Sequence, residues 1–153
     1  MTALYLVSLL ALAPARADTC KPISVQRIAS AQALLDQSVE VEAIDRSSMV
    51  ERARILLERT QDDDPGCKTA KSLHKHATKM LRAAEPVSMA ASLEDALMHA
   101  LERVEALEQA EQPDPGEIEV VRFMLAELGN HYPDDERVEA LVRRTVAVQR
   151  GEK

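Results

Sequence analysis

The residues whose chemistry is easiest to assign are the two cysteines of the chain, Cys20 and Cys67. In an oxidising compartment an even pair of cysteines favours one disulfide bond. The chain-entropy model gives a bridge across a loop of this length about 4 kcal/mol of stabilisation. The Cys-x-x-Cys spacing of redox-active pairs is absent from the sequence. We therefore predict a structural disulfide between Cys20 and Cys67, with two free thiols as the alternative.

Histidine, methionine and acidic side chains supply the other candidate metal ligands, but their spacing argues against a metal site. His74 and His76 are two residues apart, so on a helix their side chains point about 200° from each other. The methionines form no dense run of the kind that would hold a soft copper ion. The acidic residues 62–64, aligned as a calcium loop through Gly66, would place Ser72 where that loop needs a glutamate. The sequence predicts no metal and no other cofactor.

No arrangement typical of a catalytic site stands out. The sequence contains no Gly-x-Ser-x-Gly motif, and its four glycines are isolated, which excludes a glycine-rich phosphate loop. None of the 26 acidic residues can be singled out as a catalytic pair, because most are expected on solvated helix faces. We predict that the chain is not an enzyme.

The charge of the chain limits its partners. The net charge is −7, and aromatic residues make up only 2% of the sequence. An acidic protein repels phosphate backbones and anionic membrane surfaces, and few aromatic rings are available to stack on bases or sugars. Nucleic acid is therefore excluded as an expected partner, which leaves another protein.

The N-terminal segment, residues 1–17, has the pattern of a cleavable signal peptide. An uncharged, leucine-rich run covers residues 3–13, and after Pro14 the small-x-small sequence Ala15-Arg16-Ala17 follows. The apolar run is shorter than the roughly 20 residues that a membrane-spanning helix needs. We predict cleavage after Ala17, no membrane insertion afterwards, a periplasmic or secreted location, and a single domain over residues 18–153. Lipidation at Cys20 is the alternative.

A 3.6-residue hydrophobic period dominates the rest of the chain, which predicts an all-α fold. Short loops between the helices imply antiparallel helical hairpins. Three start signals stand out: a capping box at Ser48 and Glu51, and the Asp-Pro pairs at 64–65 and 114–115. Pro86 predicts a break, and Gly129 predicts a helix end. The expected helices begin near residues 24, 48, 65, 88, 115 and 134.

One segment of the sequence resembles a known repeat. Residues 125–135, Leu-Ala-Glu-Leu-Gly-Asn-His-Tyr-Pro-Asp-Asp, resemble the turn between tetratricopeptide repeats. That family repeats its helical hairpin about every 34 residues. The turn prolines of this chain, Pro65, Pro115 and Pro133, are unequally spaced and do not fit such a period. We interpret the resemblance as shared helical-hairpin geometry and expect a stack or bundle that is only loosely similar to that family.

The fourth expected helix, residues 88–110, is the longest. At 1.5 Å per residue it would measure about 34 Å, against about 24 Å for each of the two helices after it. Part of its apolar face would then lie uncovered. We predict a partner-binding surface at its start, formed by Met89, Leu93 and Leu97, with Glu94 and Asp95 as its acidic rim.

These observations together favour a function through protein contacts. We expect an exported, acidic, non-catalytic helical domain, for example an adaptor or an accessory subunit of an envelope assembly. The alternative is a helical bundle that binds a small ligand or a metal.

The export hypothesis makes a direct prediction. Intact-mass analysis of protein isolated from its host should give a mature chain that begins at Asp18, which removes Arg16 and makes the net charge −8. A mass that retains Met1 to Ala17 would contradict export by this signal. A mass that fits an acylated Cys20 would support the lipoprotein alternative.

Overall fold

The structure, a computed structural model, describes residues 19–40 and 45–152. The predicted signal peptide at residues 1–17 lies outside these residues. The described residues form six helices and no strand, which confirms the predicted all-α fold. None of these helices is long and apolar enough to cross a bilayer. The helices are α1 (Pro22–Ser38), α2 (Arg46–Asp63), α3 (Lys68–Ser88), α4 (Leu93–Gln109), α5 (Pro115–His131) and α6 (Glu136–Arg150).

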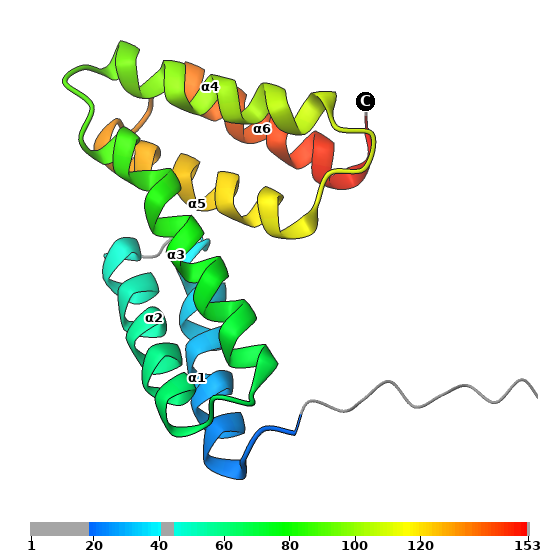
Figure 1. Cartoon of the computed structure of the whole chain (residues 1–153). Helices are drawn as coiled ribbons and strands as arrows, with labels where there is room; N and C mark the ends of the chain where they lie inside the picture. The colour runs from blue at the N-terminus through cyan, green and yellow to red at the C-terminus, as the bar shows by residue number, and fades with distance from the viewer. Residues whose placement is uncertain (1–18, 41–44, 153) are drawn as a thin grey trace, which may run out of the picture.

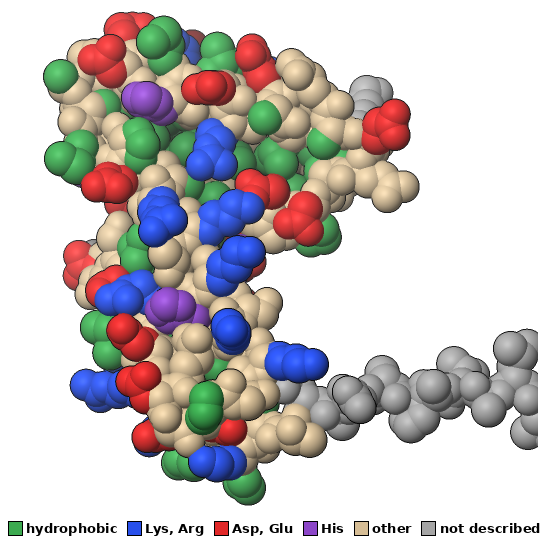
Figure 2. All heavy atoms as spheres, in the orientation of Figure 1, with side chains coloured by type: hydrophobic (Ala, Val, Ile, Leu, Met, Phe, Trp, Pro, Cys, Tyr) green, Lys and Arg blue, Asp and Glu red, His purple; other side chains and the backbone are tan. Residues whose placement is uncertain are grey.

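The helices pack in two groups that α3 and α5 connect (Figure 1). The helices α1, α2 and α3 lie side by side, and α4, α5 and α6 form a second group at the C-terminal end of α3. The molecule is hollowed between the two groups on the face shown in Figure 2. Both α3 and α5 contact members of both groups, so they hold the groups together.

Helix α5 is the most enclosed element. Its Val120 and Phe123 belong to the hydrophobic core of the first group. Its Val121, Leu125 and Leu128 belong to the core of the second group. Eight of its 17 residues are buried, and they cover most of the helix circumference. The other nine residues of α5 are partly or fully exposed.

The start of α5 is as predicted, but its end is not. The Asp114 side chain accepts a hydrogen bond from the backbone N–H of Glu117 at 3.1 Å, and Pro115 occupies the first helical position. Gly129 was expected to end the helix, and this prediction is wrong, because α5 continues to His131. A glycine inside a helix costs about 1 kcal/mol relative to alanine. Burial of Leu125 and Leu128 on the same turns offsets that cost.

The predicted break at Pro86 is also wrong. Pro86 lies inside α3, near its C-terminal end, and Ala83, Ala84 and Val87 around it are buried. The lost backbone hydrogen bond is compensated by this packing. Helix α4 begins only at Leu93, so it has 17 residues, the same number as α5. The predicted mismatch in helix length does not exist.

Two start signals in the first group act differently from the prediction. Ser48 lies inside the first turn of α2, and the residue before that helix is Asp45 in a left-handed conformation, φ 55°. Glu51 therefore does not form a capping box, and it accepts hydrogen bonds from Arg54 instead. Helix α3 begins at Lys68, three residues after the predicted proline start.

Asp64 stabilises the start of α1. Its buried carboxylate accepts the backbone N–H of Lys21 at 2.7 Å, at the N-terminus of α1. A negative charge at this position is favoured by the helix dipole. Nearby, Arg27 of α1 pairs with Asp63 at 2.5 Å. The acidic turn after α2 thus anchors the beginning of α1.

The predicted disulfide is confirmed. Cys20 and Cys67 are bonded with their Cα atoms 4.7 Å apart, and the described residues contain no free cysteine. Cys20 lies just before α1, and Cys67 lies just before α3. The bridge therefore reinforces the anchor that Asp64 makes by hydrogen bonding. Disulfides of this kind are typical of oxidising compartments.

Replacement of both cysteines tests the importance of this anchor. A Cys20→Ser, Cys67→Ser variant should lose about 2 to 5 kcal/mol of unfolding free energy, because the chain before α1 is no longer tied to the α2–α3 turn. Chemical denaturation followed by circular dichroism measures this loss. Two thiols that react in the native, non-reduced protein would contradict the bridge.

Candidate docking groove

The residues that the sequence predicted as a partner surface do not form a hollow. Met89 follows α3 and is 76% exposed, whereas Leu93 and Leu97 are partly buried against the second core. Glu94 pairs with Arg137 of α6 at 2.6 Å, and Asp95 accepts a hydrogen bond from the Ser92 hydroxyl at 2.8 Å. The two acidic residues of the predicted rim thus already have partners within the chain. The docking role of this surface stays a prediction.

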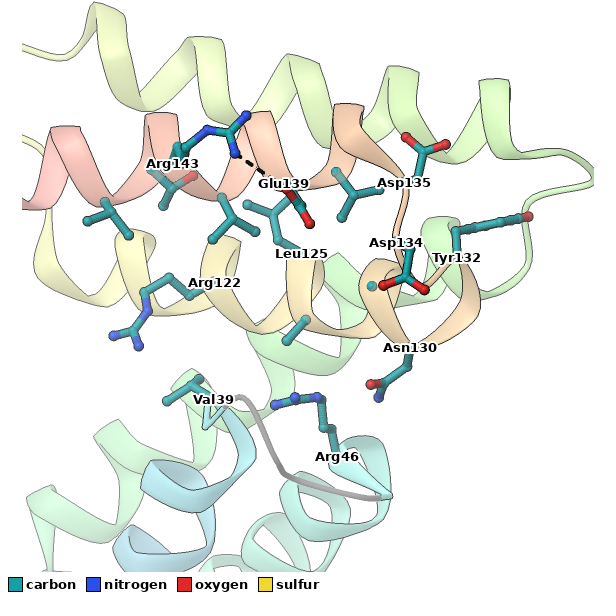
Figure 3. A pocket seen from close by; sticks show the side chains of 16 residues that line it. Val39, Arg46, Arg122, Leu125, Asn130, Tyr132, Asp134, Asp135, Glu139 and Arg143 are labelled. Carbon is teal, nitrogen blue, oxygen red and sulfur yellow. Dashed lines mark hydrogen bonds and ion pairs between the residues drawn. The ribbon is translucent and has the colours of Figure 1, made fainter.

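A groove lies elsewhere, between α5, α6 and the junction of α1 with α2 (Figure 3). Its volume is about 580 Å³. No local sequence pattern identifies it, because its residues come from α2, α5 and α6 and from the turns beside them.

The floor and one wall of the groove are apolar. Ala126 and Gly129 form the open strip of α5 beside buried Leu125, and Val142 and Val146 rise from α6. A Cβ atom added at Gly129 would meet no atom within 4 Å, so the space above this residue is empty.

The wall from α6 contains an exposed apolar residue. The apolar spacing of α6 groups Val142 with buried Val138 and Leu141. In the structure Val142 is 41% exposed and faces the groove, although Val138 and Leu141 are buried. Val142 is thus an apolar side chain that the protein's own core does not cover.

Arg46 forms the opposite side of the groove, and its position is fixed. It is 3% exposed and donates hydrogen bonds to the carbonyl oxygens of Ser38, at 2.8 Å, and Glu40. Burial lowers the pKa of Arg46, and the nearby Glu127 carboxylate opposes this shift. An arginine remains charged despite such a shift. Arg46 therefore closes the C-terminus of α1 and gives the groove a rigid polar edge.

The two ends of the groove carry opposite charges. Asp134 and Asp135 lie at one end, where the chain leaves α5 and enters α6 (Figure 3). Arg122 and Arg143 lie toward the other end. Hydrogen bonds from Arg137 lower the pKa of the Asp135 carboxyl, which keeps it ionised. We call these the acidic end and the basic end.

These end charges are only partly neutralised within the chain. Arg143 pairs with Glu139 at 3.4 Å, and Asp135 pairs with Arg137 at 3.2 Å. Among the described residues, Arg122 and Asp134 form no ion pair. Each end therefore keeps one charge that a bound molecule can neutralise.

The described residues offer one other cluster with metal-ligand chemistry, and it has a different role. Atoms of Cys20, Asp64 and Cys67 lie within 4.8 Å of one another. Both sulfur atoms are in the disulfide, and Asp64 accepts the Lys21 N–H, so this cluster is the anchor of α1.

His74 and His76 both lie in α3. His76 contacts Glu119 of α5 at 2.7 Å, and no described metal-ligand cluster includes His74 or His76.

Comparisons with known proteins do not assign this chain to a family. No protein-family model, no curated protein and no solved structure matches this chain. Functional inference therefore rests on the geometry of the groove and on the sequence.

Proposed function

We propose that this chain is an exported, non-catalytic interaction domain that binds an amphipathic helix of another protein in the groove between α5 and α6. The observation that carries the proposal is the open apolar floor at Ala126 and Gly129 beside the uncovered Val142. Apolar side chains left uncovered in a concave surface mark sites of association.

The walls of the groove favour a helical partner segment. The apolar floor of the groove is α5 and its apolar wall is α6. The backbone groups of both are used inside the helices, so no strand edge is offered to an extended peptide. A segment bound there must satisfy its own backbone hydrogen bonds, which a helix does. The small side chains of Ala126 and Gly129 let the backbone of a helix approach closely. From Arg122 to Asn130 the floor measures about 12 Å, or roughly two helical turns.

The end charges favour one direction of the bound helix. A helix carries partial positive charge at its N-terminus and partial negative charge at its C-terminus. The N-terminus is stabilised near Asp134 and Asp135, and the C-terminus near Arg122. The partner helix should then run antiparallel to α5. Basic side chains in its first turn and acidic ones in its last turn would strengthen the fit.

The proposed location follows from the signal pattern and the disulfide. Residues 1–17 have the pattern of an export signal, and the Cys20–Cys67 bridge fits an oxidising compartment. An adaptor or an accessory subunit of an envelope assembly is the role that agrees with both.

A small apolar ligand is the second candidate for the same groove. The volume of about 580 Å³ lies within the range of roughly 300 to 1,000 Å³ that small-molecule sites occupy. The groove is partly open to solvent and is not a closed cavity, so it also admits a polypeptide segment.

A substitution that fills the groove distinguishes an effect on partner binding from an effect on stability. A Gly129→Leu variant places a branched side chain in the empty space and should abolish partner capture from the envelope fraction of the host. The same change should raise the free energy of unfolding by about 0.5 to 1 kcal/mol, because leucine favours a helix more than glycine does. Pull-down with quantitative mass spectrometry and thermal denaturation are the two measurements.

Two control variants define the surface. Gly129→Ala gains helix propensity but leaves the groove open, so it should capture the partner as the wild type does. Met89→Asp changes the exposed residue of the surface predicted from sequence. Undiminished capture by Gly129→Leu would contradict the groove as the docking site. Loss of capture in Met89→Asp alone would assign docking to the start of α4.

A further inference from the structure

Helix α3 carries a row of basic side chains that the groove does not use. The helix contains five basic residues and only one acidic residue, Glu85. The complete chain has a net charge of −7, so α3 is a locally positive segment of a negatively charged protein. Helix α4 shows the reverse, with five acidic residues and one arginine. We name as the α3 basic stripe Lys68, Lys71, Lys75, Lys79 and Arg82.

The spacing of these residues makes a straight row. Successive members are three or four positions apart, so all five lie on one side of the helix. The row from Lys68 to Arg82 is about 21 Å long. The opposite side of α3 is the apolar one, where Ala70, Ala77 and Met80 are buried.

Most of the stripe is not neutralised by the rest of the molecule. Lys71, Lys75 and Arg82 are exposed and form no ion pair with any described residue. Lys79 pairs with Glu117 of α5, and Arg103 of α4 also approaches Glu117, at 3.7 Å. The stripe therefore keeps a net positive charge up to its junction with the second group.

Basic side chains gather over α3, beside the indentation between the two groups of helices (Figure 2). A row beside an indentation suits an elongated chain better than a planar membrane. None of the large hydrophobic side chains that are strongly exposed among the described residues lies on α3.

We propose that the α3 basic stripe binds an acidic segment of a partner protein, at a surface separate from the groove. A segment with several carboxylates along about 20 Å would pair with Lys71, Lys75 and Arg82 at once. Nucleic acid fits less well, because the net charge of −7 repels a long, dense row of phosphates. The stripe and the groove have no residue in common.

The test uses the complete mature protein and a fluorescein-labelled peptide of about twelve glutamates. Fluorescence anisotropy at low salt should show binding in spite of the net negative charge of the protein, and binding should weaken as salt is added. A triple variant, Lys71→Gln, Lys75→Gln, Arg82→Gln, should bind about tenfold more weakly, because three exposed charge pairs are lost. Gln keeps helix propensity close to that of Lys and Arg, so circular dichroism should be unchanged.

A matched control removes the same amount of charge elsewhere. Arg52, Arg59 and Arg150 are exposed and form no ion pair with described residues, so their triple Gln variant has the same net charge as the test variant. This control should bind the peptide within twofold of wild type, as should Gly129→Leu, whose altered groove lies apart from the stripe. Equal loss in the two triple variants, or no binding by the wild type, would overturn the proposal. So would tighter binding to phosphatidylglycerol vesicles or to a single-stranded oligonucleotide.

Discussion

The two-sided burial of α5 is the constraint on which the rest of the structure depends. Phe123 is fully buried in the core with α1, α2 and α3, and Leu128 is fully buried in the core with α4 and α6. A helix that is apolar around most of its circumference cannot remain at a surface, so neighbours must cover both sides. The burial of α5 on both sides also offsets the free-energy cost of Gly129 within the helix. Both groups of helices are thereby fixed to one central element.

This arrangement also produces the groove. Once α3, α4 and α6 cover α5, the part of its surface that remains uncovered includes Ala126 and Gly129. The walls come from Val142 of α6 and from Arg46 at the α1–α2 junction, and Arg46 is held in place by carbonyl oxygens of the α1 end. The anchor at Cys20, Cys67 and Asp64 lies at the other end of α1 and ties that helix to the α2–α3 turn. The same packing of the helices therefore holds the two groups together and forms the groove.

The sequence predicted the features that depend on local chemistry or composition. The all-α class follows from hydrophobic period, the start of α5 from Asp114 and Pro115, and the disulfide from the even cysteine count. Predictions failed where tertiary packing outweighed a local signal, as at Pro86 and Gly129. The groove could not be predicted, because Val142 has the same spacing as core residues. Whether such a side chain is covered depends on where the neighbouring helices end. The hydrophobic period of a single helix carries no information about those ends.

The central claim is that the open strip of α5 and the facing wall of α6 receive a helix from another protein. The most direct measurement is cross-linking in the host from a photoreactive amino acid placed at Val142, with the same residue placed at exposed Arg52 for comparison. The account predicts that position 142 cross-links to one segment of one protein, with apolar residues spaced three and four positions apart, and that position 52 does not. Absence of any protein cross-link from position 142, or the same products from both positions, would contradict it.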